Sequence, residues 1–346
     1  MKLLRQILYP ISFLYGQIIR FRNKSYDKGI RTSTIFAIPN IVVGNLNTGG
    51  TGKTPHVEYF IRLLENTFKV AVLSRGYKRK TTGFYLAGAD ANADLIGDEP
   101  MQYHLKFKNL IVAVDGNRTN ALNQLKKLEN KPDVVLLDDA FQHRRVKSKI
   151  NILLTAYNDL YVDDYMLPTG NLRECAKNAR RASHIIVTKC PTDLSTEEQQ
   201  DIKSKLNPKE HQKLYFSRIK YKDEVVNNTA AISFEDLKSY KVLLVTGIAN
   251  PKPLQVFLSE NDIDFTALKY SDHHHFTEKD KQKINKKIQN FNTEKAIVLT
   301  TEKDYVRSFI GDKNVFYLPI EIVFLQNSKL FNEEIITYVD QSTRNS

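Results

Sequence analysis

A glycine-rich stretch directly after an apolar run places the strongest constraint on how this chain folds. It reads GNLNTGGTGKT from Gly44 to Thr54 and follows the residues IPNIVV. Its end fits the phosphate-loop pattern G-x-x-x-x-G-K-[ST] at Gly52 and Lys53, although Asn47 stands where the pattern has its first glycine. The apolar run before the loop and the helical stretch KTPHVEYFIRLL after it supply the strand, loop and helix in which such a loop binds phosphate. The sequence therefore predicts a nucleotide-binding α/β domain.

The loop keeps the residues that contact phosphate even without the first glycine. Gly49, Gly50 and Gly52 allow the dihedral angles at which successive backbone N–H groups converge on an anion, and asparagine is among the residues that tolerate left-handed geometry. Lys53 would reach the outer phosphates, and the Thr54 hydroxyl would bind Mg²⁺. A glycine turn with a purely structural role is the alternative. The predicted nucleotide-binding residues are Asn47, Thr48, Gly49, Gly50, Thr51, Gly52, Lys53 and Thr54.

A metal-binding element is expected at the end of the apolar run DVVLLDD. Asp138 and Asp139 close this predicted strand, and an acidic residue at a strand end beside a phosphate loop commonly holds Mg²⁺. Either carboxylate could be the one that binds Mg²⁺ directly. The alternative is that the two aspartates only cap a helix or face solvent. A guanine-specific protein would be expected to carry Asn-Lys-x-Asp, whereas VTKCPTD has Pro191 in place of the aspartate. ATP with Mg²⁺ is therefore the expected cofactor pair.

Short β-branched runs alternate with helical patterns along the chain after residue 35. Apolar strands without polar alternation, each followed by a helix, indicate a parallel sheet covered on both faces, so we predict a doubly wound, P-loop NTPase-like α/β domain. A second, smaller α/β series follows, and the strand-like stretches KLYFSRIKY and NVFYLPIEIVFL are predicted to pair as a two-stranded ribbon between the lobes. The predicted divisions are an N-terminal amphipathic helix in 1–30, the nucleotide-binding domain in 31–212, the ribbon and smaller α/β domain in 213–325, and a C-terminal helix and tail in 326–346.

The N-terminal stretch MKLLRQILYPISFLYGQIIRFRNK has an amphipathic pattern. Ile7, Ile11 and Ile18 gather with other apolar residues on one helical face, while charged and amide residues lie largely opposite. The uncharged run between Arg5 and Arg20 is well short of the roughly 20 residues that cross a bilayer, and no small-residue cleavage site precedes RFRNK. We therefore predict a helix in the plane of the membrane surface. Packing of its apolar face on the protein's own core is the alternative.

Charge and cysteine content narrow the class of partner and compartment. Lys+Arg of 51 against Asp+Glu of 39 gives a formal net charge of +12, which favours an anionic partner: nucleic acid, acidic lipid or a phosphorylated substrate. The sequence shows no recognised nucleic-acid module and no aromatic-rich basic strand pattern, so nucleic acid is disfavoured. The two cysteines, Cys175 and Cys190, are too few for a zinc cage or a disulfide framework, and a reducing cytosolic environment is the default expectation.

Eight short motifs, in their order along the chain, resemble those of the tetraacyldisaccharide 4'-kinase (lipid A 4'-kinase) family: VGNLNTGGTGKTP, LSRGYKR, IGDEP, LLDDAFQHRR, LPTGNLRE, TGIANP, DHHHF and TTEKD. The resemblance extends over roughly residues 1–325, and the combination is more specific than any single motif. It also accounts for Asn47, since the family's loop commonly lacks the first glycine and carries the doubled one. Two departures stand out: Ala140 replaces the usual glycine of D-D-G-F-Q-H, and three consecutive histidines follow Asp272.

The resemblance implies roles for residues that the chain alone would not single out. Asp98 in IGDEP matches the family's proposed catalytic base, and His273 in DHHHF matches the histidine proposed to act with it. Arg173 and Glu174 in GNLRE resemble the pair placed near the transferring phosphoryl group, where Arg173 is suited to stabilise its charge. Without the resemblance, Asp98 would more often be a helix start, the three histidines would more often be exposed or a fortuitous metal site, and Arg173 and Glu174 would pass for an ordinary surface ion pair. The implied catalytic residues are Asp98, His273, Lys53 and Arg173, and the implied metal ligands are Thr54, Asp138, Asp139 and Glu174.

The implied reaction is transfer of the γ-phosphate of ATP to the 4'-hydroxyl of a tetraacylated glucosamine disaccharide 1-phosphate, a lipid A precursor. It would take place at the cytoplasmic face of a Gram-negative inner membrane, with the enzyme bound peripherally or monotopically to anionic lipid, which suits the basic amphipathic N-terminus. Residues expected near the disaccharide or its phosphate are Ser74, Arg75, Tyr77 and the basic stretch QHRRVK. Closure of the two lobes about the ribbon would assemble the site and exclude water.

Other functions remain open at the level of the sequence. One is a kinase for another amphiphilic or sugar substrate. Another is a nucleotide-driven switch or carrier, whose ATP turnover would be independent of any lipid. A third is a basic nucleic-acid binder, whose affinity would fall steeply with salt.

Overall fold

The computed structural model describes residues 5, 7–272 and 274–344, which form two compact units. The first unit contains residues 1–219 and 322–346, and the second contains residues 220–321. The chain therefore enters the second unit once and returns once. Both the predicted N-terminal helix and the predicted C-terminal helix belong to the first unit.

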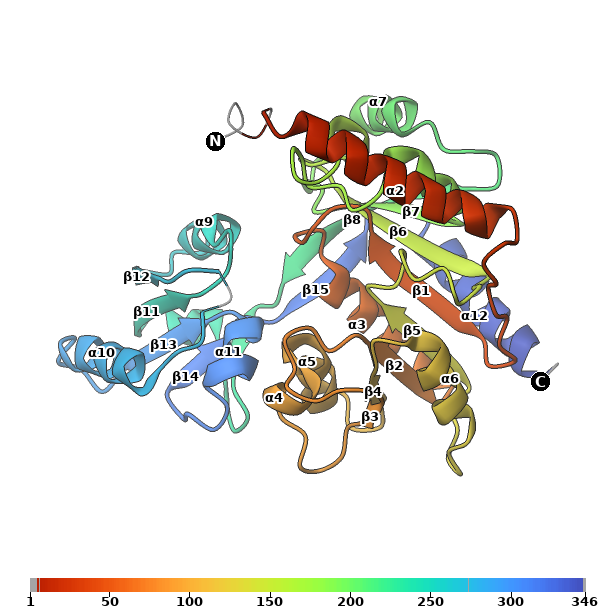
Figure 1. The fold of residues 1–346 in the computed structure, drawn as a ribbon. Helices are drawn as coiled ribbons and strands as arrows, with labels where there is room; N and C mark the ends of the chain where they lie inside the picture. Colours follow the sequence, from red (N-terminus) through yellow and green to blue (C-terminus); the bar gives the residue numbers. More distant parts are fainter. Residues whose placement is uncertain (1–4, 6, 273, 345–346) are drawn as a thin grey trace. The chain divides into compact units, whose positions relative to one another are not determined.

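A nine-stranded sheet forms the centre of the first unit, with the strand order β15-β8-β7-β6-β1-β5-β2-β4-β3 (Figure 1). The pairs of β1 with β5 and β6, of β2 with β4 and β5, and of β7 with β6 and β8 are all parallel, whereas β3 is antiparallel to its neighbour β4. The strands are β1 (Asn40–Asn45), β2 (Val70–Ser74), β3 (Tyr85–Leu86), β4 (Ile111–Val114), β5 (Val134–Asp138), β6 (Ile150–Ala156), β7 (His184–Thr188), β8 (Lys213–Tyr221) and β15 (Ile320–Phe324).

Both faces of this sheet are covered, as continuous apolar strands require. Every residue of β1, β2, β5 and β7 is buried. On one face, Leu137 of β5 shares a core cluster with Leu122 of α6 and Ile202 of α7. On the other, α3 packs on β1 and β5, and Phe331 of α12 packs on Phe60 of α3 with ring centroids 5.8 Å apart. The helices of this unit are α2 (Tyr9–Asp27), α3 (Lys53–Leu64), α4 (Ala93–Ile96), α5 (Asp98–Lys106), α6 (Arg118–Lys126), α7 (Thr196–Leu206) and α12 (Ser328–Arg344), with 3-10 turns η1 (Tyr161–Asp163) and η2 (Ala176–Arg181).

The second unit is a smaller α/β sheet with the order β10-β9-β14-β13-β11-β12. Its centre is parallel, and β9 and β10 add an antiparallel edge. The elements are β9 (Glu224–Val226), β10 (Ala231–Ser233), α8 (Phe234–Leu237), β11 (Lys241–Thr246), α9 (Lys252–Glu260), β12 (Phe265–Lys269), α10 (Glu278–Gln289), β13 (Ala296–Thr300), α11 (Glu302–Ser308) and β14 (Val315–Tyr317).

Strands β8 and β15 are neighbours, and they are the two segments through which the chain passes between the units. The amide of Leu325 donates to the carbonyl of Phe216 at 2.9 Å, and the amide of Lys222 donates to the carbonyl of Pro319 at 3.0 Å. The predicted fold class is thus confirmed, including the doubly wound sheet, the smaller α/β domain and the paired ribbon.

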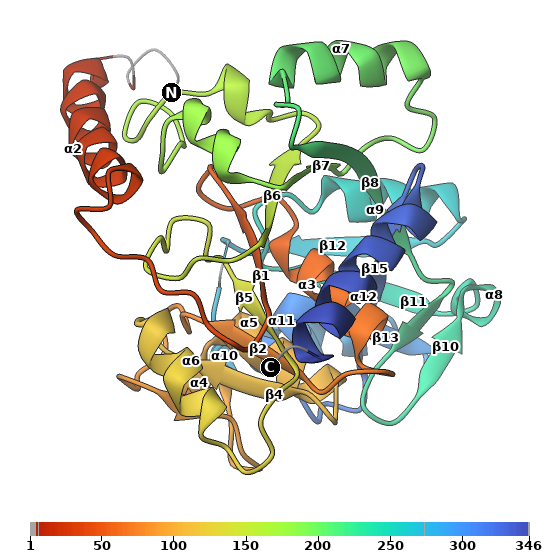
Figure 2. The same cartoon turned by 90° about the vertical axis from the view of Figure 1, so that its right-hand side faces the viewer.

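Helix α2 lies on the outside of the first unit (Figure 2). Its polar side faces inward. Its buried residues are Ser12, Gly16, Asn23 and Ser25. The apolar side chains that were predicted to gather on one face are exposed and do not pack on the core of the protein. Their exposed fractions are 54% for Ile11, 63% for Leu14 and 67% for Ile18. Among the residues that the structure describes, no helix is both long enough and apolar enough to span a bilayer.

Candidate phosphate-binding and catalytic site

The glycine-rich loop joins the end of β1 to the start of α3 in a conformation that only its glycines allow. Gly49, Gly50 and Gly52 have φ angles of +81°, +66° and +79°, which residues with a Cβ rarely adopt. Gly52 is the residue before the first turn of α3. A glycine-rich turn that leads into a helix N-terminus directs backbone N–H groups toward one point, which is the geometry that binds phosphate.

Asn47 has a different role from the one its sequence position suggests. It is not among the described residues with positive φ, so its tolerance of left-handed geometry is not used. It is buried instead, it bridges to Leu172, and its side-chain amide donates to Asp164 at 3.3 Å. The next amide, that of Thr48, donates to the carbonyl of Asn171 at 2.8 Å. The first half of the loop is therefore held by the segment around residues 164–172.

Asn45, the last residue of β1, holds the second half of the loop. Its side-chain N–H donates to Thr51 Oγ1 at 2.8 Å, and its Oδ1 accepts from Lys53 Nζ at 3.3 Å and also from Arg173. Thr188 Oγ1 donates to the Thr51 carbonyl at 2.9 Å. Asn45 could not be singled out from the sequence, because an asparagine at a strand end carries no motif of its own.

Two cations meet at Asp139, directly beside the loop. Arg173 donates to both carboxylate oxygens, at 3.0 and 2.8 Å, and Lys53 Nζ lies 3.7 Å from Oδ1. Burial by itself would raise the pKa of Asp139, but Lys53 and Arg173 more than offset it and hold the pKa below its usual range. Asp139 also has a φ of +46°, an uncommon angle that directs the chain out of the sheet at this point. The left-handed residue is thus Asp139, and Ala140, which is not among the positive-φ residues, fits where the family has glycine.

Asp138 lies in a more negative environment than its neighbour. It is buried, and burial together with the charges of Asp139 and Glu99 raises its pKa to about 7. Arg118 donates to the Asp138 main-chain carbonyl at 3.2 Å. A buried carboxylate whose ionisation is opposed by other carboxylates is a place where a divalent cation would relieve repulsion.

Tyr103, one turn into α5, connects the predicted metal ligands to that helix. Its side chain is fully buried, and its hydroxyl is hydrogen-bonded to Thr54 and lies 3.4 Å from Asp138 Oδ2. Asp98 is the first residue of the same helix and Glu99 the second. Tyr103 was not predicted from the sequence, since a tyrosine within a helical pattern is more often a core residue.

Glu58 fixes α5 against α3. It is buried, and its carboxylate accepts from Gln102 at 2.8 Å and from Lys106 at 2.7 Å, both on α5. The helix that begins with Asp98 is therefore tied to the helix that begins with Lys53.

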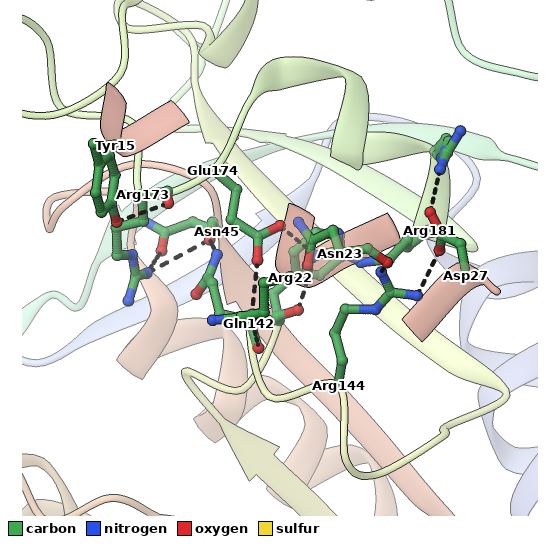
Figure 3. A network of polar contacts seen from close by, with 12 residues as sticks. Tyr15, Arg22, Asn23, Asp27, Asn45, Gln142, Arg144, Arg173, Glu174 and Arg181 are labelled. Atoms are coloured by element: carbon green, nitrogen blue, oxygen red, sulfur yellow. Dashed lines mark hydrogen bonds and ion pairs between the residues drawn. The ribbon is translucent and has the colours of Figure 1, made fainter. Parts of the chain in front are cut away.

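Glu174 is fully buried between two guanidinium groups (Figure 3). Its Oε1 lies 3.4 Å from Arg22 and its Oε2 lies 2.7 Å from Arg181. Within the described part of the chain, no contact joins Glu174 to Thr54, Asp138 or Asp139, and no group of three histidine, cysteine or acidic residues is arranged to hold a metal ion. A metal role for Glu174 thus stays a prediction.

A strongly cationic region follows Asp139 in the chain. Burial, followed by the charges of Arg118, Arg145, Arg22 and Arg75, lowers the pKa of His143 to about 4, so its imidazole is neutral at pH 7. A cavity of about 500 Å³ lies beside it, and its lining includes Arg31, His143, Arg144, Lys147 and Arg181. Within the first unit, the structure gathers the loop, Lys53, Asp139 and Arg173 into one site, whereas His273 lies outside the described residues.

This arrangement suits transfer of a phosphoryl group. Loop N–H groups, the Lys53 ammonium and the Arg173 guanidinium supply fixed positive charge where an anion would develop charge. Carboxylates at the end of β5 and the hydroxyl of Thr54 supply the oxygen ligands that Mg²⁺ prefers.

Comparisons with known proteins identify relatives that are named as kinases, the enzymes that transfer phosphoryl groups. The family model described as tetraacyldisaccharide-1-P 4'-kinase matches residues 4–339. The chain is 49% identical to the tetraacyldisaccharide 4'-kinase of Flavobacterium psychrophilum, with 100% of both chains covered, and 43% identical to that of Bacteroides thetaiotaomicron, with 98% of this chain and 94% of that protein covered. A crystal structure described as the "apo" form of LpxK from Aquifex aeolicus in complex with ATP is similar with a TM-score of 0.78 and 29% identity, and the match covers 97% of this chain and 99% of that one.

Proposed function

The chain belongs to the tetraacyldisaccharide-1-P 4'-kinase family, and we propose that the loop, Lys53, Asp139 and Arg173 form its phosphoryl-transfer centre on the surface of a membrane. The protein is an ATP-dependent kinase that transfers the γ-phosphate to the 4'-hydroxyl of tetraacyldisaccharide 1-phosphate in lipid A biosynthesis. The main support for this centre is that Lys53 and Arg173 both pair with Asp139, beside three glycines with left-handed backbone angles.

Mg²⁺ fits this centre, with Thr54, Asp138 and Asp139 as the residues that would hold it. The raised pKa of Asp138, caused by burial and by the carboxylates of Asp139 and Glu99, supports a divalent cation there. When bound, Mg²⁺ neutralises charge on the phosphates of ATP. The loop from Asn47 to Thr54 would hold the phosphates through its backbone N–H groups.

Side chains of this unit divide the remaining work. Lys53 neutralises charge on the outer phosphates, and Arg173 turns from Asp139 toward the transferring group, whose charge it stabilises. Asp98 accepts the proton of the sugar hydroxyl, and His273 orients Asp98. The basic cavity beside His143 supports a place for the phosphate of the lipid substrate, because its arginine and lysine side chains match an anionic headgroup.

The kinase works at the membrane surface, with α2 as its contact. The outward apolar face of α2 supports this, since exposed clusters of large apolar residues mark interaction sites. We place the enzyme peripherally or monotopically on the cytoplasmic face of the bacterial inner membrane, where the basic surface meets anionic lipid.

The reaction is tested directly with ATP labelled at the γ-phosphate and tetraacyldisaccharide 1-phosphate in detergent micelles with Mg²⁺. The label is expected on the 4'-oxygen of the lipid. Release of labelled phosphate at an equal rate without lipid would favour a nucleotide-driven switch, and a folded protein that leaves the lipid unlabelled would overturn the assignment.

Removing the Tyr103 hydroxyl should weaken the apparent affinity for Mg²⁺ that is measured through ATP binding. The variant Tyr103→Phe loses the group that joins Thr54 and Asp138, and one such hydrogen bond contributes about 0.5–1.5 kcal/mol, so we expect an apparent Mg²⁺ affinity roughly 2- to 13-fold weaker. The measurement is a Mg²⁺ titration of ATP binding by calorimetry.

Tyr161→Phe is the matched control, because Tyr161 is buried in the same unit and its hydroxyl has no hydrogen bond to another described residue. Equal Mg²⁺ curves for the two variants would mean that Tyr103 is only a core residue.

Polar substitutions on the outer face of α2 should release the enzyme from membranes. The triple variant Ile11→Ser, Leu14→Ser, Ile18→Ser is expected to bind anionic vesicles more than about tenfold more weakly, because fully burying each such side chain is worth about 1.5–3 kcal/mol. Activity on micellar substrate should change much less. Vesicle co-sedimentation gives the result, with Leu330→Ser on α12, which is 64% exposed, as the control. Unchanged sedimentation of the triple variant would mean that this face does not contact lipid.

A further inference from the structure

We propose that Arg22, on the helix assigned to the membrane surface, is a positioning residue for the phosphoryl-transfer centre. Through Glu174 and Gln142 it holds the segment that carries Arg173. This inference rests on the proposed roles of Arg173 and α2, and it adds that the membrane helix is a structural part of the centre.

Helix α2 is joined to the first unit mainly by polar contacts. Ser12 Oγ donates to Thr169 Oγ1 at 2.7 Å. The Tyr15 hydroxyl donates to the Arg173 main-chain carbonyl at 3.1 Å (Figure 3). Near the other end, Arg144 donates to the Asn23 carbonyl at 2.8 Å. Hydrogen bonds are directional, so these contacts set the position of the helix more narrowly than apolar packing would.

Arg22 makes the contact that is most costly to lose. One of its guanidinium nitrogens lies 2.7 Å from the Gln142 carbonyl and 3.4 Å from Glu174 Oε1. Glu174 has no exposed side-chain surface, and its other guanidinium partner is Arg181. A buried carboxylate that loses one partner is left with uncompensated charge, so the segment around Glu174 is expected to move when Arg22 is replaced.

Movement there would reach the phosphate loop through Asn45. Gln142 Nε2 donates to the Asn45 main-chain carbonyl at 2.8 Å. The Asn45 side chain accepts from Lys53 and from Arg173 and donates to Thr51. Arg173 itself directly precedes Glu174 in the chain. Arg22 thus stands at one end of a continuous set of contacts that ends at both cations of the centre.

The chain offers a matched control for the charge of Arg22. Arg20 lies on the same helix, is exposed, and has no hydrogen bond or ion pair with any other residue in the described part of the chain. Arg20→Gln and Arg22→Gln remove the same charge near the membrane, so both should reduce binding to anionic vesicles alike. Only Arg22→Gln disturbs the contacts of Glu174.

The experiment measures kcat and KM on micellar lipid, where membrane docking is not required, and normalises kcat to the fraction of protein that binds ATP. We expect Arg22→Gln to lower kcat on the order of 10-fold, with KM for ATP little changed, because loss of an outer-shell partner typically costs 10- to 100-fold. Arg20→Gln should keep the kcat of the wild type. Arg22→Lys, which keeps one charge for Glu174 but not the forked geometry, should recover kcat in part.

Equal kcat values for Arg22→Gln and Arg20→Gln would overturn the inference. It would also be overturned if the raw rate of Arg22→Gln fell only in proportion to its ATP-binding fraction, so that the normalised kcat stayed at the wild-type value, because that is the result of a purely structural role. A wild-type protein that failed to label the lipid would instead overturn the proposed reaction, and the present inference with it.

Discussion

Replacing Lys53 with alanine is expected to lower kcat by about 10³-fold, as loss of a single strong donor to the charge that develops in the transition state typically costs 10²–10³-fold. In the structure, Lys53 Nζ lies 3.3 Å from Asn45 Oδ1 and 3.7 Å from Asp139 Oδ1. The ammonium is therefore available for the outer phosphates and does not support the apolar core. The substitution should leave the thermal unfolding temperature nearly unchanged.

Single-turnover transfer from labelled ATP measures this effect, and circular dichroism checks the fold. Lys126→Ala is the control, because Lys126 is an exposed lysine in the last turn of α6. Lys53→Arg should not restore turnover, since a forked guanidinium cannot replace a compact ammonium inside a glycine loop. Comparable activity of a correctly folded Lys53→Ala protein would mean that this loop is not the phosphate site.

Replacing Asp98 with asparagine should lower kcat by about 10²–10⁴-fold while disturbing the affinity for Mg-ATP little. A positioned base supplies only part of the acceleration, because phosphoryl transfer is largely dissociative. Asp98 begins α5, the helix that Tyr103 connects to Thr54 and Asp138, so it lies on an element joined to the predicted metal ligands. Asp94→Asn is the control, as Asp94 is a nearby exposed aspartate paired with Lys80.

A double variant tests whether His273 acts through Asp98. If His273 orients the carboxylate, Asp98→Asn combined with His273→Ala should cost much less than the sum of the two single losses, because either change disables the same function. Fully additive losses would separate the two residues. If Asp98→Asn chiefly weakened Mg-ATP binding, Asp98 would be reassigned to the metal.

Much of the fold could be predicted because local patterns decide it. Continuous apolar runs such as VVLL in β5 have no polar face to expose, so they require a sheet that is covered on both sides. The loop could be placed because left-handed backbone needs glycine, and Gly49, Gly50 and Gly52 are where the structure uses it. The family could be recognised because its motifs keep their order. These features depend on neighbours in the chain, which the sequence displays directly.

The site depended on contacts between residues that are far apart in the sequence. Asn47 was expected to preserve the loop through left-handed geometry, but it does so through Asp164, which lies 117 residues later. In the sequence, Tyr103 resembles a core residue, whereas in the structure its hydroxyl contacts Thr54 and Asp138. No local pattern encodes such pairs, because a side chain's partner depends on which elements the sheet brings together.

The N-terminal helix shows the division most clearly. Its sequence alone determined that one face is apolar and that the apolar run is too short to span a bilayer. Whether that face points to the core or away from it depends on what the rest of the chain presents. Here the rest presents polar partners, including Glu174, which lies 152 residues after Arg22 and is buried without any exposed side-chain surface. Because a buried carboxylate must be paired, the polar side of α2 turns inward, and the apolar side is left facing outward.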